Sequence, residues 1–454
     1  MEVTKTLAQF VVDSRYDAIP EKVRHEAKRS VLNWLGCAIG ASRHEGIDIA
    51  LAALAGFSGP AQASLLGRGE RLDIMHAALL NGISSHMFDF DDTHLKTVIH
   101  PSGPVASALL ALAEYKPMSG ADFLHAFILG VEVECRIGNA VYPSHYDIGW
   151  HITGTAGVFG AAAAVGRALK LNAQQMTWAL GIAATQSSGL REMFGTMCKP
   201  FHPGRAAQNG MTAAFLASKN FTSSERGIEA PRGFANVLAT ARNYDEITGK
   251  LGQTWEVALN TYKPFACGIV IHPIIDGCVQ LRNEHKLKAA DIEGIALKVH
   301  PLVLELTGKK TPQVGLEGKL SVYHSAAVAI IHGEGGEDVY SDACVRDPEV
   351  TTLRDKISAE VDKSVHEDAA YIAIRLKDGR VLTKHVEHAI GSLARPMSDA
   401  DLEAKFRKFA KGILTPAEGD VLLKLCWSLD KLKDAGEIAR ASVPAGAAKK
   451  AKAS

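Results

Sequence analysis

The chain has 454 residues, with 50 Lys plus Arg, 50 Asp plus Glu, and 47% apolar residues. This length exceeds the size at which a single hydrophobic core keeps growing, so we expect more than one domain. The zero formal net charge excludes a strong long-range attraction to nucleic acid or to an anionic membrane surface.

Cysteine usage and the N-terminal stretch indicate the compartment. Seven cysteines are scattered along the chain without a CxxC pair, which favours neither a disulfide framework nor a zinc site. The first residues, MEVTKTLAQFVVDSRYD, lack the apolar core of a signal peptide. The longest weakly polar stretch, 154–166, is too short to span a bilayer. We therefore expect a cytoplasmic protein that binds neither membranes nor nucleic acid.

The first part of the chain is predicted to be helical. Its segments are rich in Ala, Leu and Gly, and apolar residues recur at helical spacing. Pro20 and Gly40 lie where a helix would begin and end. The stretch 151–171 is apolar nearly all round, which predicts a buried central helix. We expect helices over 20–42, 103–115, 119–138, 151–171, 172–189 and 204–220.

The pattern changes from about residue 270. A strand is expected over 292–301, helices over 320–334 and 347–358, and two strands over 368–389 with a hairpin at Asp378-Gly379. The helical pattern then returns over 397–432. The predicted fold class is mainly α. It comprises an all-helical domain built from both chain ends (1–268 and 395–440), a smaller α+β domain (269–394) and a disordered tail (441–454).

The stretch HMFDFDDTHLKTVIHPSG (86–103) gathers three aspartates and three histidines. The aspartate spacing does not match a magnesium motif, and no second acidic motif accompanies it. His94 and His100 lie six residues apart, which is not the one-turn spacing of a helical metal-binding pair. Two interpretations stay open for these polar residues: acid–base chemistry, or capping of the next helix by Asp, Thr or Ser side chains.

Two further clusters carry cationic side chains. In MCKPFHPGRAA (197–207), Lys199, His202 and Arg205 precede an expected helix, and cations beside helix N-terminal amides hold carboxylates or phosphates. The alternative is an ordinary solvated loop between helices. In YKPFACGIVIHP (262–273), Lys263 and His272 lie among apolar residues, where a lysine without a function is unusual.

The remaining sequence features say less about function. His151 opens the apolar stretch, and a single histidine there is more often structural than catalytic. No GxGxxG, P-loop, GxSxG or kinase motif is present, so nucleotide cofactors and serine-nucleophile hydrolysis have no support. We expect neither a metal nor an organic cofactor.

Together these segments resemble the MmgE/PrpD family, which includes 2-methylcitrate dehydratases, cis-aconitate decarboxylases and iminodisuccinate epimerases. The resemblance spans nearly the full chain and implies a helical domain, a smaller α+β lid, a homodimer, and a cofactor-free active site between the domains. The segments that resemble the family are DFDDTH…HPSGPV (89–105), GWHITGTAGVFGAAAA (149–164), KPFHPGRAAQNG (199–210), YKPFACGIVIHPIID (262–276), GKLSVYHSAAVAI (318–330) and DPEVTTLRDKI (347–357).

The resemblance also implies which residues line the site. The expected catalytic residues are Asp89, Thr93, His100, His151, Lys199 and Lys263, and the expected substrate-binding residues are His202, Arg205, Cys267 and His272. Gly268 stands where the decarboxylase branch carries a histidine, which counts against decarboxylation. The match between His94 and His100 needs a one-residue insertion, so the role of His94 stays open.

Members of this family act on carbon acids flanked by carboxylates. Proton removal beside a carboxylate needs fixed cations where charge develops and a base within reach of the carbon. We therefore predict a small di- or tricarboxylate substrate and a 2-methylcitrate-dehydratase-like hydro-lyase. The alternatives are an epimerase of the iminodisuccinate type, a cis-aconitate-type decarboxylase, or a non-catalytic dimer that only binds carboxylates.

Overall fold

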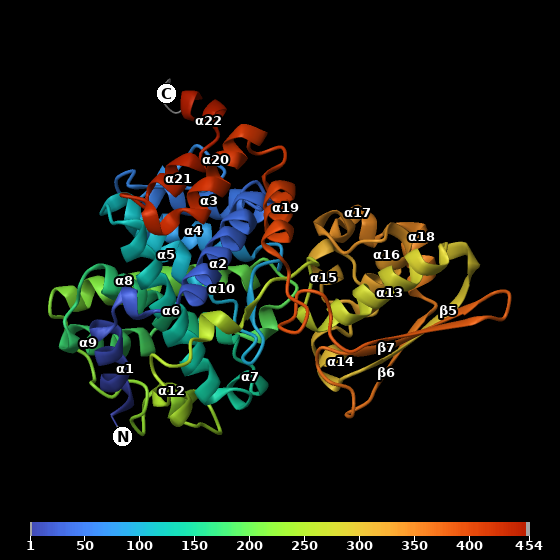
Figure 1. The fold of residues 1–454 in the computed structure, drawn as a ribbon, viewed down its shortest axis with the longest axis horizontal. Helices are drawn as coiled ribbons and strands as arrows, with labels where there is room; N and C mark the ends of the chain where they lie inside the picture. The colour runs from blue at the N-terminus through green and yellow to red at the C-terminus, as the bar shows by residue number, and fades with distance from the viewer. Residues whose placement is uncertain (1, 451–454) are drawn as a thin grey trace.

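Helices from both ends of the chain build one part of the molecule, and a four-stranded sheet with its covering helices builds the other (Figure 1). The structure is a computed structural model that describes residues 2–450. In Figure 1 the helical part lies on the left and the α+β part, here called the lid, lies on the right. The predicted fold class, mainly α with a small α+β part, is confirmed.

The helical part contains short two-stranded pairs besides its helices. Its helices are α1 (Val3–Asp13), α2 (Glu21–Gly40), α3 (Glu45–Leu54), α4 (Ile74–His86), α5 (Ser102–Tyr115), α6 (Gly120–Val141), α7 (Ser144–Asp147), α8 (Ile152–Ala168), α9 (Ala173–Ala184), α10 (Cys198–Ser218), α11 (Phe234–Leu238), α12 (Asp245–Thr248), α19 (Asp399–Ala410), α20 (Pro416–Trp427), α21 (Glu437–Ala441) and α22 (Ala445–Lys450). Its strands are β1 (Ala63–Ser64), β2 (Arg71–Leu72), β3 (Thr93–His94) and β4 (Asn260–Thr261).

The buried central helix is α8, as the sequence predicts. Every residue from Ile152 to Gly166 is buried, and α8 packs against α5, α6 and α10. Small residues permit these close crossings: a Cβ on Gly210 of α10 would lie only 2.5 Å from the Cβ of Ala161 of α8. Apolar burial and close dispersion contacts therefore organise the helical part around α8.

Helix α10 begins earlier than the sequence predicts, at Cys198, and it contains Pro203. It crosses α4 so closely that a Cβ on Gly204 would lie 2.3 Å from the Leu79 carbonyl oxygen. This tertiary packing outweighs the local tendency of the proline to end a helix. The alternative of a solvated loop does not hold, because the first turns of α10 already contain three of the cluster residues: Lys199, His202 and Arg205.

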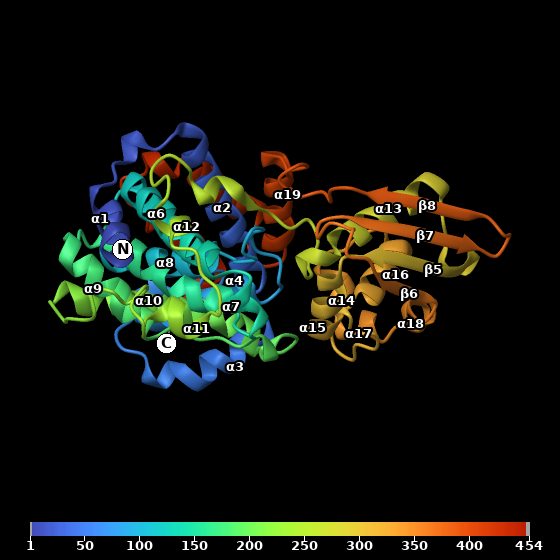
Figure 2. The same cartoon turned by 90° about the horizontal axis from the view of Figure 1, so that it is seen from below.

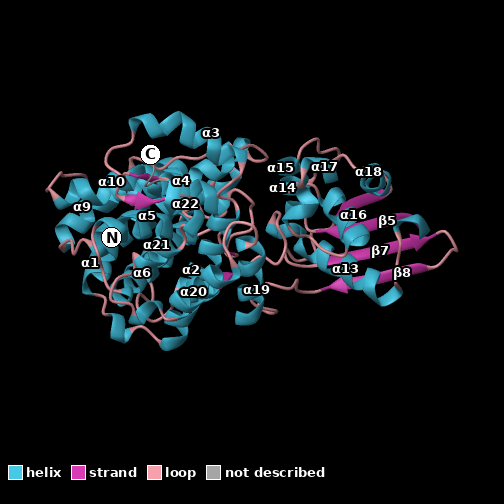
Figure 3. Ribbon diagram, turned by 90° about the horizontal axis from the view of Figure 1, so that it is seen from above, coloured by secondary structure: helices cyan, strands magenta, loops and turns pink. Residues whose placement is uncertain are grey.

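The lid sheet has the strand order β6-β5-β7-β8, with helices on one face (Figures 2 and 3). Strand β5 pairs parallel with β6 and antiparallel with β7, which pairs antiparallel with β8. The expected hairpin joins β7 and β8, with Gly379 at φ +88°. The lid elements are α13 (His272–His285), β5 (Ile292–Val299), α14 (Pro301–Thr307), α15 (Gly315–Gly318), α16 (Val322–His332), α17 (Asp342–Val345), α18 (Pro348–Arg354), β6 (Ile357–Val361), β7 (Ala370–Leu376) and β8 (Val381–Val386).

Strand β6 is the main difference from the predicted lid, because the sequence favours a helix over 347–358. The structure ends α18 at Arg354 and starts β6 at Ile357. Only Ile357 of this strand is buried, and the residues after it are partly or fully exposed. An edge strand of this kind lacks the period-2 alternation that marks strands in a sequence.

The C-terminal helices return to the helical part, where α19 and α20 pack against α2. From α19, Lys405 Nζ donates to the carbonyl oxygens of Phe90, at 2.6 Å, and Lys263, at 2.9 Å. The domain boundaries at 268/269 and 394/395 stay predictions. The expected disorder from 441 differs from the structure at Ala445–Lys450, which form α22, and residues 451–454 lie outside the described residues.

All seven cysteines are free thiols, and five of them are buried. Within residues 2–450, no helix combines the length and the apolar character needed to cross a bilayer.

Candidate active site

The loop after α4 brings Asp89 to the junction between the helical part and the lid. Its backbone is left-handed, with φ +52°, a conformation that Asp adopts more readily than most residues. Its carboxylate lies between two ammonium groups: Oδ2 is 2.8 Å from Lys199 Nζ, and Oδ1 is 2.6 Å from Lys263 Nζ. Lys263 also donates to the Asp89 carbonyl oxygen at 3.0 Å. All three side chains are buried.

Burial and charge act in opposite directions on this triad. Burial raises the pKa of the Asp89 carboxyl, but the ammonium groups of Lys199 and Lys263 outweigh burial and hold that pKa well below its usual range. Burial also lowers the pKa of Lys199, and the Asp89 carboxylate opposes that shift. Because removal of one partner leaves a buried charge uncompensated, breaking the triad would cost about 3–5 kcal/mol.

His100 presents one defined ring nitrogen as a proton acceptor. Its Nδ1 lies 2.9 Å from the Asp92 carbonyl oxygen and 3.3 Å from Thr93 Oγ1. Since a carbonyl oxygen only accepts, Nδ1 carries the proton and Nε2 is left to accept another. Burial lowers the pKa of His100 to about 3, so its imidazole is uncharged at neutral pH.

His151 and His202 form a second imidazole pair, with their Nδ1 atoms 2.8 Å apart. Burial lowers the pKa of both rings, to well below the ordinary range for His151 and to about 4 for His202. The rings of Phe194 and His151 form a T-shaped contact, with centroids 5.0 Å apart. The pair is therefore a second uncharged group that can exchange protons.

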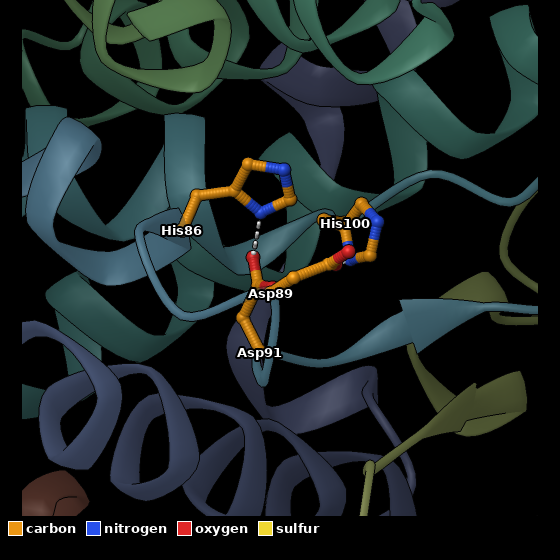
Figure 4. A group of neighbouring side chains, drawn as sticks. All are labelled: His86, Asp89, Asp91 and His100. Carbon is orange, nitrogen blue, oxygen red and sulfur yellow. Dashed lines mark hydrogen bonds and ion pairs between the residues drawn. The ribbon is translucent and has the colours of Figure 1, made fainter. Parts of the chain in front are cut away.

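Asp91 lies next to two of the histidines, and Figure 4 marks its contact with His86. Its Oδ2 lies 2.8 Å from His86 Nδ1, and its Oδ1 lies 3.4 Å from His100 Nδ1. The rings of His86 and His100 are 4.6 Å apart between centroids. Burial raises the pKa of Asp91, but the two histidines outweigh burial and lower it. A charged Asp91 fixes the ring orientation and tautomer of His86 through their hydrogen bond, and it lies close enough to His100 to act on that ring by its charge.

The same cluster has the donor atoms of a metal site. Four of its side chains offer ligand atoms that all lie within 4.8 Å of one another: His86, Asp89, Asp91 and His100. However, both Asp89 oxygens already contact an ammonium group, from Lys199 and Lys263. A divalent ion would have to displace these two cations, which already supply the positive charge. The donor set therefore fits a proton-transfer network better than a metal site, and the absence of a metal cofactor stays a prediction.

Asp92 differs from its neighbour Asp91. Its Oδ2 accepts from Ser102 Oγ at 2.6 Å and from Asn260 Nδ2 at 2.5 Å, and no cation contacts it among the residues that the structure describes. Burial, reinforced by the charge of Asp91, raises the pKa of Asp92 to about 7. The capping interpretation does not hold for α5, because its N-cap residue is Pro101 and no side chain among the described residues caps it. The Asp92–Ser102 contact instead joins the loop to the first residue of α5 through their side chains.

The site residues surround a cavity of about 50 Å³ between the helical part and the lid. All six residues expected to be catalytic line it: Asp89, Thr93, His100, His151, Lys199 and Lys263. The lid side contributes apolar atoms, mainly from Ile269, Val270, Leu306 and Leu320, together with Thr307 and the backbone of Gly268. This volume holds a few water molecules but no tricarboxylate, so substrate binding requires the two walls to separate.

The expected substrate-binding residues lie behind or beside the cavity rather than in its lining. His202 reaches it only through His151. Arg205 donates to Gln208 Oε1 at 2.6 Å and stacks over Phe201, which keeps its guanidinium on its own helix.

The other two expected binding residues are fully buried. Burial raises the pKa of Cys267 to about 12, so the thiolate is not available. Burial lowers the pKa of His272 to about 3, and its ring packs edge-on against Phe265. The structure does not bring these two residues into the cavity lining.

The structure also resolves His94. Its Nδ1 lies 2.7 Å from Thr97 Oγ1, and its Nε2 lies 2.9 Å from Glu256 Oε2. Both ring nitrogens are thus used within the helical part, and His94 does not line the cavity. It supports the loop rather than the chemistry.

Sequence reasoning missed the bridging role of Asp91, the partner His86, and two aromatic wall residues, Tyr146 and Phe194. Asp91 lies within the DFDDTH segment (89–94) and His86 lies shortly before it, but their spacing matches no known motif. Tyr146 and Phe194 reach the cavity only through tertiary packing, so no local signal identifies them.

Two family models match consecutive parts of the chain. Residues 5–247 match the MmgE/PrpD N-terminal domain, and residues 265–430 match the MmgE/PrpD C-terminal domain. The chain is 26% identical to cis-aconitate decarboxylase of Aspergillus terreus over 462 residues, covering 95% of this chain and 94% of the relative. It is 28% identical to the human cis-aconitate decarboxylase over 452 residues (95% and 92%). It is 23% identical to the mitochondrial 2-methylcitrate dehydratase of Yarrowia lipolytica over 425 residues (87% and 81%). The chain belongs to the MmgE/PrpD family.

Proposed function

We propose that this protein is a cofactor-independent lyase that removes a proton from a carbon beside a carboxylate of a small di- or tricarboxylate. The observation that carries the proposal is the Asp89 carboxylate held between Lys199 and Lys263, on a cavity that also contains two uncharged imidazoles. Fixed cations and neutral bases on one water-poor cavity are what abstraction of a carbon-bound proton requires.

The charge of the cavity favours an anionic substrate. Two ammonium groups face one carboxylate there, which leaves an excess positive charge. Each ammonium has three N–H donors, and Lys199 uses one of them on Asp89. The remaining donors can stabilise the negative charge that grows on a substrate carboxylate as its neighbouring carbon loses a proton.

His100 and His151 are the candidate bases. Both are uncharged because burial lowers their pKa values. The negative charges of a bound carboxylate would raise these values toward neutrality, where a general base works best. The hydrogen bond from His100 Nδ1 to the Asp92 carbonyl oxygen holds His100 in the tautomer that leaves Nε2 unprotonated.

The step after proton removal distinguishes the candidate reactions. In dehydration, the electron pair left on carbon forms the new double bond, and a β-hydroxyl leaves as water after receiving a proton. We favour this 2-methylcitrate-dehydratase-like reaction because Gly268, on the lid wall, supplies no side chain where the decarboxylase branch carries a histidine. Decarboxylation of cis-aconitate is the second candidate, because two of the full-length relatives above carry that name. Epimerisation and carboxylate binding without catalysis remain the alternatives.

The test is a panel of 2-methylcitrate, citrate, cis-aconitate and iminodisuccinate, with the products identified by nuclear magnetic resonance. The proposal expects an unsaturated product that retains every carboxylate. Carbon dioxide release from cis-aconitate would replace dehydration with the second candidate. Stable binding of the panel without any conversion would favour the carboxylate-binding dimer.

We also propose a cytoplasmic homodimer. Seven free cysteines fit a reducing compartment, and the dimer is implied by the family resemblance. Light scattering should give twice the monomer mass at micromolar concentration, and a monomer mass would contradict the assembly.

A further inference from the structure

A larger hollow of about 630 Å³, here called the vestibule, adjoins the catalytic cavity. Three apolar residues line both spaces and thus form the partition between them: Phe194, Leu306 and Leu320. Phe194 comes from the helical part, whereas Leu306 and Leu320 come from the lid. The partition is therefore made by both walls, and it opens when the walls separate.

The vestibule lining contains two cations, Arg191 and Lys309, and Lys309 pairs with Glu317 of the lid. Arg191 is the one that joins the two walls. It lies on a short 3-10 helix (Arg191–Met193) of the helical part, and its Nη2 is 2.8 Å from Oε1 of Glu305 on lid helix α14. Its Nη1 donates to the Tyr146 carbonyl oxygen at 2.9 Å, and the guanidinium stacks 4.1 Å from the Tyr146 ring centroid. Tyr146 lines the catalytic cavity, so Arg191 is held at the boundary between the two spaces.

The two members of this ion pair are held differently. The Arg191 side chain is 15% exposed and has fixed partners within the helical part, whereas Glu305 is 56% exposed. Ion pairs with so exposed a partner contribute little, about 0–1 kcal/mol. Arg191 is therefore a preorganised cation whose carboxylate partner is easily exchanged.

The segment that carries Arg191 is bounded at both ends by glycines with positive φ. Gly189 has φ +132° and Gly195 has φ +84°, and residues other than glycine rarely adopt these backbone conformations. Between these glycines lie Arg191 and the partition residue Phe194. Arg191 and the ring that closes the cavity thus lie three residues apart on one short segment.

We propose that the vestibule is the docking site of the incoming carboxylate substrate, where a substrate carboxylate replaces Glu305 on Arg191 and so removes one contact between the lid and the helical part. A guanidinium binds a carboxylate through two parallel N–H donors, so one anion can take the place of another at this position. This inference rests on the proposed function for the substrate class, and it adds an outer site to the catalytic cavity.

The experiment measures how fast a tricarboxylate associates with the full chain. The probe is propane-1,2,3-tricarboxylate, which has neither a hydroxyl to eliminate nor a double bond. Stopped-flow tryptophan fluorescence can report binding, because Trp150 forms a backbone bridge to Leu190 of the vestibule wall. Glu305→Gln removes the competing carboxylate, and the association rate constant should rise about two- to fivefold. Arg191→Gln should lower it about tenfold.

Glu192→Gln is the matched control, because Glu192 also lines the vestibule and makes no ion pair among the described residues. It removes the same charge but leaves the Arg191–Glu305 ion pair intact, so the association rate should rise clearly less than in Glu305→Gln. Equal increases in the Glu305 and Glu192 variants would overturn the proposal, since general electrostatics would then explain both. The comparison of Glu305→Gln with Glu192→Gln tests the docking role even if Arg191→Gln does not fold.

The inference and the proposed function fail in different ways. If the probe binds but its rate is the same in all variants, the docking role is wrong and the catalytic proposal stands. If the probe binds to none of the proteins, wild type included, the carboxylate substrate class is wrong and the docking role falls with it.

Discussion

The two walls of the catalytic cavity differ in chemistry. The wall from the helical part carries the charged and titratable groups, with Asp89, Lys199 and Lys263 in one ion triad. The lid wall offers mainly apolar side chains such as Ile269, Val270 and Leu320. A lid of this kind adds no reactive group, but it excludes water and so strengthens every interaction on the opposite wall.

This difference between the two walls predicts which kinetic constant a substitution in each wall should change. A charged wall acts on the transition state, because its charges oppose those that develop during proton transfer. An apolar wall acts on binding and closure. Substitutions in the charged wall should therefore lower kcat, and substitutions in the apolar wall should mainly change KM.

The largest expected effect comes from the two lysines. Lys199→Met and Lys263→Met each remove an ammonium that would stabilise growing charge, so kcat should fall about 100-fold or more while KM changes less. Steady-state kinetics on folded protein tests this, with circular dichroism and thermal unfolding as folding controls.

Arg205→Gln is the matched control for the lysines, because it also removes a cation from α10 but lies outside the cavity lining. We expect less than about a threefold change in kcat for this variant. Near-wild-type kcat in both lysine variants would contradict the electrostatic role of the charged wall.

A smaller effect, about tenfold in kcat, is expected for Asp91→Asn, because Asp91 acts through His100 rather than on the substrate. The Asp91 carboxylate raises the pKa of His100, against the larger lowering by burial. Its removal should lower that pKa further, so the acid limb of the kcat–pH profile should move to lower pH as the rate falls. A uniform loss of rate with an unmoved limb would instead indicate a purely structural role.

Leu320→Ala tests the apolar wall. It removes part of the partition between cavity and vestibule without touching a charge, so we expect a change of only a few-fold, mainly in KM. Initial-rate kinetics would show this directly. A loss of kcat as large as that of the lysine variants would mean that the division between the walls is wrong.

The smallest expected effect is that of chelation. Lys199 and Lys263 already bind both oxygens of the Asp89 carboxylate, so we expect no metal ion there. Prolonged dialysis against EDTA should therefore leave activity within about twofold of the untreated enzyme. Metal analysis of the dialysed protein provides the control. Activity that is lost and returns only with a divalent ion would make His86, Asp89, Asp91 and His100 metal ligands instead.

Much of this arrangement was accessible from the sequence. The apolar periodicity of 151–171 predicts the buried helix α8, and Asp378-Gly379 predicts the hairpin between β7 and β8. The six residues expected to be catalytic meet at one cavity, although their roles stay predictions.

The remaining features depend on tertiary contacts that leave no local signal. Helix α10 continues through Pro203 because Gly204 packs against α4. Strand β6 is stabilised by pairing with β5 rather than by its own pattern. Likewise, Arg205 has the residue type of a carboxylate ligand, but its position on α10 directs it to Gln208.

The most direct test of the central claim is hydrogen–deuterium exchange at the carbon beside a substrate carboxylate, measured by proton nuclear magnetic resonance in heavy water. With the substrate identified by the panel, the wild-type enzyme should incorporate deuterium at that carbon in recovered substrate or in the product of the reverse reaction. Lys263→Met should do so about 100-fold more slowly. Exchange at equal rates in the two proteins, or no exchange with any polycarboxylate of the panel, would contradict proton abstraction stabilised by the lysines of the charged wall.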